Sequence, residues 1–145
     1  QEAEAANDEL NSTRSGAMVV LDVTLRTLLT RKETSKGREL NTAAGTAFAD
    51  IVDYYIEAYE ETNPQVPGCA LHDPLAVGVA LDPSFLTTLG LNMFVSTDPA
   101  TYGRTIGDQA RLDQPETNVK VGINVDADRY LATFMTYLTK LFAAN

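Results

Sequence analysis

The spacing of apolar residues predicts helices along much of the chain. Apolar residues recur every three or four positions from a cap at Asn41 or Thr42 to near Thr62, and again after a cap at Asp126 or Asp128. Shorter helices are expected over residues 3–14 and 24–30, with a charged connector over 31–38. The two long apolar faces consist of Ala44, Ala47, Phe48, Ile51, Tyr55 and Tyr59, and of Leu131, Phe134, Met135, Leu138, Leu141 and Phe142.

Strand-like runs alternate with these helices. Residues 17–23 form an apolar run typical of a buried strand, and strands are also expected over 91–97, 103–108 and 119–125. The alternation predicts the α/β class, with the C-terminal part of an open, mostly parallel, Rossmann-like sheet, flanking helices and a small antiparallel element near 91–125. Because only one run is of buried type, we expect the rest of the sheet in sequence outside this chain.

Composition narrows the class of protein. The chain has 145 residues, the size of one domain, and its net charge of −9 argues against nucleic acid and anionic membrane surfaces as partners. No apolar run approaches the ~20 residues of a membrane span, and no signal peptide is seen. The single cysteine, Cys69, excludes an internal disulfide and fits a reducing, cytoplasmic location, although secretion stays open. A chain that begins at Gln1 is expected to be processed, truncated or one piece of a longer protein.

The only histidine, His72, precedes Asp73 and Pro74 at a predicted helix start. An imidazole can pass a proton near neutral pH, and a carboxylate can hold a hard cation. Both residues also have ordinary interpretations: Asp73 as the N-cap with Pro74 at the first helical position, and His72 as a packed or exposed side chain.

Other polar residues allow two interpretations as well. Tyr55 and Tyr59 share a helix face, where they either pack in the core or direct hydroxyls at a polar ligand. Asp22 follows the run 17–23, where a turn or cap competes with ligand binding at a strand end. The sequence has no glycine-rich phosphate loop, nucleophile elbow, Cys/His metal spacing or dense Asp cluster.

The segment Leu71-His72-Asp73-Pro74-Leu75-Ala76-Val77, followed by Leu81-Asp82-Pro83, resembles the C-terminal signature of the inosine–uridine-preferring nucleoside hydrolases. The resemblance extends over essentially the whole chain, through segments 21–24, 48–59, 102–108 and 118–126 and the final helix. It implies hydrolysis of the N-glycosidic bond of ribonucleosides to ribose and free base in nucleoside salvage. It further implies a calcium-bound water as nucleophile and a homo-oligomeric protein.

The resemblance also implies roles for particular residues. His72 would be the acid that assists departure of the base, Asp73 would be a calcium ligand, and Tyr55 and Tyr59 would lie near the base. The family's N-terminal Asp-rich motif and its central ribose-binding segment have no counterpart here, so residues 1–145 correspond to the C-terminal portion of a single hydrolase domain. Most calcium ligands are then expected from the N-terminal half.

Three hypotheses account for a chain that carries only the C-terminal part of such a site. The chain is one polypeptide of a processed nucleoside hydrolase whose N-terminal half is a second chain; or it is a non-catalytic binding module; or it is an inactive fragment. We expect the chain by itself to be inactive, because it lacks the group that activates the nucleophile, and one carboxylate does not make a tight calcium site.

Overall fold

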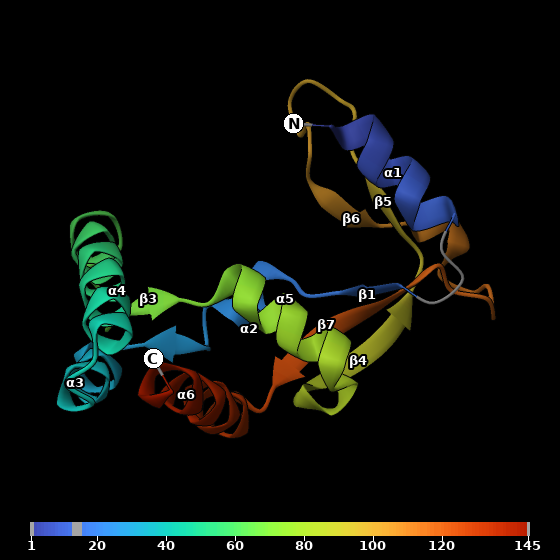
Figure 1. Ribbon diagram of the computed structural model, residues 1–145. Helices are drawn as coiled ribbons and strands as arrows, with labels where there is room; N and C mark the ends of the chain where they lie inside the picture. Colours follow the sequence, from blue (N-terminus) through green and yellow to red (C-terminus); the bar gives the residue numbers. More distant parts are fainter. Residues whose placement is uncertain (1, 13–15, 145) are drawn as a thin grey trace. The chain divides into compact units, whose positions relative to one another are not determined.

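The computed structural model describes residues 2–12 and 16–144 (Figure 1). The chain forms two compact units. Unit 1 comprises residues 1–20 and 87–124, and unit 2 comprises residues 21–86 and 125–145. Each unit has its own packing, and the candidate chemistry of the sequence falls in unit 2.

Unit 1 is built on a small sheet with the strand order β1-β7-β4. Strand β1 (Gly16–Met18) pairs in parallel with β7 (Val119–Val125), in the register Gly16 to Val119 and Met18 to Val121. Strand β4 (Leu86–Leu91) lies on the other side of β7. The core at this sheet consists of Met93, Val119 and Val121, packed by Leu10, Met18, Val20 and Leu91.

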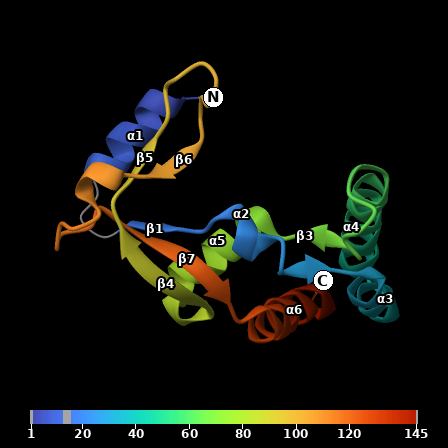
Figure 2. The same ribbon diagram turned by 180° about the vertical axis from the view of Figure 1, so that it is seen from behind.

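A hairpin and a helix complete unit 1 (Figure 2). Strands β5 (Met93–Val95) and β6 (Thr105–Gly107) pair antiparallel, and the 3-10 helix η2 (Gln109–Arg111) follows. Helix α1 (Ala3–Ser12) packs against β5, where the Asn7 side chain accepts the Val95 backbone N–H at 3.0 Å. Asn118 likewise receives the Met93 N–H and donates to the Met93 carbonyl. These amide side chains satisfy backbone groups at the strand edge that would otherwise need water.

Unit 2 contains a close helix pair, α3 (Arg31–Glu39) and α4 (Ala43–Thr62), which lie side by side in Figure 1. Thr30 and Glu33 form a capping box at the start of α3, and Thr42 caps α4. The backbones meet at Gly37 and Gly45, where a side chain on either glycine would collide with the opposite helix. On the outer side of this pair, Arg38 of α3 bridges Asp50 and Asp53 of α4 at 2.7 and 2.8 Å.

The remainder of unit 2 connects that helix pair to the C-terminal helix. The short strands β2 (Leu28–Leu29) and β3 (Cys69–Ala70) pair antiparallel, and helix α2 (Leu21–Thr24) precedes them. Helix α5 (His72–Leu81) and the 3-10 helix η1 (Pro83–Phe85) pack on α6 (Ala127–Ala143). The ring of Tyr130 fits against Gly78 of α5 and stands edge-on to Phe85 at 5.4 Å.

Several predictions from the sequence are confirmed. The α/β class, the strand over 119–125, the antiparallel element and the two long helices are all present, with Thr42 and Asp126 as the caps. The strand expected over 103–108 is reduced to Thr105–Gly107. The end of the helix that was expected over residues 3–14 lies outside the described residues. None of the helices in the described part of the chain is long and apolar enough to cross a membrane.

Other predictions are wrong. The apolar run 17–23 divides into strand β1 and helix α2, and residues 24–30 form a turn and strand β2 rather than a helix. The charged connector is helix α3, which owes its order to the capping box and the glycine contact rather than to an apolar stripe. The strand expected over 91–97 is instead the end of β4 and a separate β5.

The glycine contact between α3 and α4 predicts that replacing a glycine there by alanine destabilises the fold, which is the opposite of the usual effect in helices. In an exposed helix, replacing Gly by Ala stabilises by about 1 kcal/mol. Gly45→Ala should instead lower the free energy of unfolding by about 1–3 kcal/mol, because the new methyl group meets the Gly37 backbone. Urea unfolding followed by circular dichroism measures the change, with Ala47→Gly, at an exposed position of the same helix, as the control for intrinsic helix propensity. A stabilised Gly45→Ala variant would refute the close approach.

Candidate functional site

The local fold around His72 places this residue at the first turn of α5, directly after strand β3. The strand is buried, with Cys69 and Ala70 only 1% and 3% exposed. Leu71 links the two elements and donates its backbone N–H to the Thr27 carbonyl at 3.0 Å. Burial raises the pKa of the Cys69 thiol to about 11, so this cysteine stays neutral and is a core residue rather than a nucleophile.

Both nitrogens of the His72 ring have hydrogen-bond partners from other elements. Nδ1 lies 2.7 Å from the Thr24 hydroxyl oxygen at the end of α2. Nε2 lies 2.9 Å from the hydroxyl of Tyr59 on α4. The ring is therefore held between two helices that are far from it in sequence. The sequence analysis identified His72 and Tyr59 but missed Thr24. Thr24 lies in segment 21–24, which resembles the family, but no sequence pattern distinguishes it as a site residue.

Tyr55 and Tyr59 lie one turn apart on α4, as predicted, and their rings meet edge to face at 5.2 Å. Tyr55 is 44% exposed, whereas Tyr59 is partly buried against His72. Burial, together with the neighbouring Tyr55 phenol, raises the pKa of Tyr59. The Tyr59 hydroxyl therefore keeps its proton at neutral pH and is able to donate it in a hydrogen bond.

Asp73 does not have the capping role that its sequence position suggested. Leu71 is the N-cap of α5, no side chain caps this helix, and Asp73 is an exposed residue of the first turn. Within residues 2–12 and 16–144, no three side chains of His, Cys, Asp or Glu come together as a possible metal site. Asp22, which was expected after a strand, is also exposed and lies within helix α2. The Asp73 carboxylate fits a hard cation by its chemistry but supplies one ligand group.

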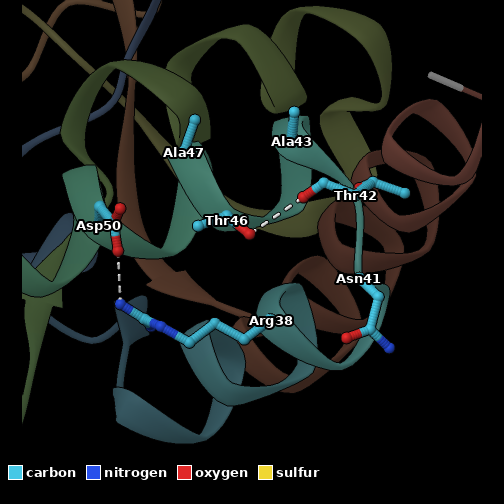
Figure 3. Close-up of a pocket in the computed structure, with 7 residues that line it drawn as sticks. All are labelled: Arg38, Asn41, Thr42, Ala43, Thr46, Ala47 and Asp50. Carbon is cyan, nitrogen blue, oxygen red and sulfur yellow. Dashed lines mark hydrogen bonds and ion pairs between the residues drawn. The ribbon is translucent and has the colours of Figure 1, made fainter.

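Two surface hollows in unit 2 lie apart from these residues. One, of about 590 Å³, lies between the end of α3 and the first half of α4 and contains the Arg38–Asp50 ion pair (Figure 3). The other, of about 420 Å³, lies beside Pro64 and Gly68 and includes Arg31 and Glu60. His72, Asp73, Tyr55 and Tyr59 line neither hollow.

The sequence of the chain matches a known protein family. A sequence model described as inosine-uridine preferring nucleoside hydrolase matches residues 1–132. A protein of that name from Crithidia fasciculata is 27% identical over 139 residues, which are 95% of this chain and 44% of the relative.

Solved structures agree with this match. A purine-preferring ribonucleoside hydrolase from Gardnerella vaginalis is 53% identical, with a TM-score of 0.82 over 86% of this chain and 40% of that one. A plant nucleoside hydrolase has a TM-score of 0.81 over 94% of this chain and 45% of its own, and at 22% identity it shows the fold alone. The chain thus spans less than half the length of these relatives. The match over residues 1–132 shows that the chain belongs to the inosine-uridine preferring nucleoside hydrolase family.

Proposed function

We propose that the chain is the C-terminal portion of a nucleoside hydrolase domain and supplies the proton-donating part of its site. The reaction is hydrolysis of the N-glycosidic bond of ribonucleosides, which frees ribose and the base for salvage. The observation that carries the proposal is the His72 ring, held between Thr24 and Tyr59 at the start of α5, in a chain of this family. A fixed imidazole beside a leaving nitrogen is suited to general acid catalysis.

His72 and the two tyrosines beside it have different roles in this proposal. His72 protonates the leaving base, so that the base departs as a neutral molecule rather than as an anion. Tyr59 holds the ring at Nε2, and Tyr55, which is 44% exposed beside it, offers an aromatic surface to the base. The purine or pyrimidine preference would depend on how a base packs against these rings.

Calcium is the cofactor that we propose, with Asp73 as one of its ligands. The exposed carboxylate in the first turn of α5 has the oxygen donors that Ca²⁺ prefers. When bound, the ion would lower the pKa of a coordinated water and so supply the nucleophile. Because six or more oxygen ligands are usual for Ca²⁺, the remaining ligands would come from outside the described residues.

The proposed partner is the N-terminal part of the same domain, present either as a second polypeptide or as further sequence. Large apolar side chains of α2 and α5 support this proposal. Leu21, Val77 and Leu81 are 62%, 61% and 82% exposed. Helix α5 is apolar around most of its circumference, which is typical of a helix buried on more than one side.

The proposal predicts that activity requires both parts of the domain. Ribose release from inosine should be absent with the 145-residue chain alone and should appear when the chain is co-expressed with the N-terminal segment of the Gardnerella vaginalis relative. In that assembly, His72→Ala should lower turnover by about 10²-fold or more. A riboside with a nitrophenolate leaving group is the matched control, because that group departs as a stable anion and needs no proton. An unchanged rate with inosine would remove His72 as the acid, and release by the chain alone would point to a complete site within it.

A second prediction concerns the cation. In the same assembly, Asp73→Asn should raise the calcium concentration for half-maximal activity by about tenfold or more, since a charged ligand is lost. Asp128→Asn is the matched control, because Asp128 is also exposed and also second in its helix. Calcium titrations of both variants measure the effect. Superimposable curves for Asp73→Asn and the unmodified assembly would exclude Asp73 as a ligand.

A further inference from the structure

The His72 ring and three neighbouring groups form a continuous line of hydrogen-bonding atoms. The line starts at the Leu21 carbonyl oxygen, which lies 3.1 Å from the Thr24 hydroxyl oxygen. It continues over 2.7 Å to Nδ1 of His72, crosses the ring, and ends 2.9 Å from Nε2 at the Tyr59 hydroxyl. The Thr24 end of this line is closed to solvent, because Thr24 is only 2% exposed.

The positions of the protons along this line follow from its first member. A carbonyl oxygen cannot donate, so the bond between Leu21 and Thr24 requires the hydroxyl proton of Thr24. The Leu21 carbonyl also receives the Leu25 backbone N–H at 2.9 Å, and its two lone pairs accommodate both donors. Thr24 then has no proton left for His72, and its oxygen is an acceptor toward Nδ1.

The opposite arrangement leaves a contact unsatisfied. If Thr24 donated to Nδ1, two oxygen atoms, those of Thr24 and Leu21, would face each other at 3.1 Å with no proton between them. Two oxygen atoms at this distance without a proton repel each other, and this contact is partly buried, so the arrangement is unfavourable. For a neutral imidazole, only one arrangement therefore satisfies all three contacts: Thr24 donates to Leu21, Nδ1–H donates to Thr24, and the Tyr59 hydroxyl donates to Nε2.

We propose that Thr24 is a positioning residue, which holds the neutral His72 ring in the Nδ1–H tautomer and leaves the Nε2 lone pair on the side of Tyr59. A histidine side chain free in water favours the other tautomer, Nε2–H, so the preference has to come from the protein. The relevance to catalysis rests on the proposed function: the Nε2 lone pair, next to the two tyrosines, would first take up a proton, and the ring would then donate that proton to the leaving base. The tautomer itself is a property of the chain without substrate.

The chain is well suited to a direct test, because His72 is its only histidine. Long-range ¹H–¹⁵N correlation spectra of the ¹⁵N-labelled chain, recorded at alkaline pH where an imidazole is neutral, report which ring nitrogen carries the proton. We expect the shift of a protonated nitrogen at Nδ1 and that of an unprotonated nitrogen at Nε2. Thr24→Val, which keeps the shape but removes the hydroxyl, should move both shifts toward each other or exchange them.

Two further variants separate this role from general packing. Thr24→Ser retains the hydroxyl and should restore the original pair of shifts. Thr27→Val removes a hydroxyl that is equally buried and bonded to the Val23 carbonyl, at 3.4 Å, and should leave the His72 shifts unchanged. Comparison of amide spectra checks that each variant is folded.

The proposal is overturned if the unmodified chain has the Nε2–H tautomer, or if a folded Thr24→Val variant keeps the Nδ1–H shifts. The first outcome is measurable even if Thr24→Val does not fold. Neither outcome depends on hydrolysis, so an inactive assembly with an Nδ1–H ring would contradict the proposed function while the role of Thr24 stands.

Discussion

The partly buried hydrogen bond between Thr24 and His72 is the contact on which the candidate site depends. It joins residues that are 48 positions apart and fixes the start of α5 against the end of α2. Tyr59 completes the arrangement from α4, so three helices meet at one imidazole. An exposed imidazole would rotate among several rotamers, whereas a ring bonded at both nitrogens has one orientation. Geometry of that kind is a requirement for proton transfer to a bound substrate.

The scaffold beneath this contact follows from two backbone constraints. The pairing of β2 with β3 aligns Leu28 with Ala70, and the Leu71 N–H continues the ladder onto the Thr27 carbonyl. This pairing sets the distance between Thr24 and His72, because both lie a few residues beyond its ends. The second constraint is the contact of Gly37 with Gly45, which holds α4 against α3. Tyr59 reaches the ring from the far end of that same helix.

The sequence predicted the elements that have strong local signals. The two long helices have side-chain caps at Thr42 and Asp126, and both were located correctly. The apolar face predicted for α4 is wrong, because Ile51 is 70% exposed and the helix buries Gly45, Ala49, Val52 and Ile56 instead. Helix α3 was missed because it lacks an apolar stripe, and its order depends on a capping box and a glycine contact with another helix. The run 17–23 was taken as one strand because a short apolar segment fits strand and helix equally well.

The site was predictable to the same extent. His72, Asp73 and the two tyrosines stand in a recognisable pattern, and a hydrogen bond of 2.9 Å joins Tyr59 to His72 in the structure. Thr24 could not be identified, because a threonine near an apolar run is ordinary, and its importance arises only when the fold brings α5 to it. A role that depends on a partner 48 residues away has no local sequence signal.

The start of α5 shows how two adjacent residues acquire different surroundings. Consecutive helical residues are about 100° apart around the axis, so His72 turns inward to Thr24 while Asp73 faces outward. Asp73 could have capped this helix, and the lack of a side-chain cap costs about 1 kcal/mol. The carboxylate still benefits from the positive end of the helix dipole, which offsets part of that cost. Asp73 makes no capping hydrogen bond, although its residue type suits a cap, and the neighbouring His72 is bonded at both nitrogens. Departures of this kind from local sequence preferences are expected at functional sites.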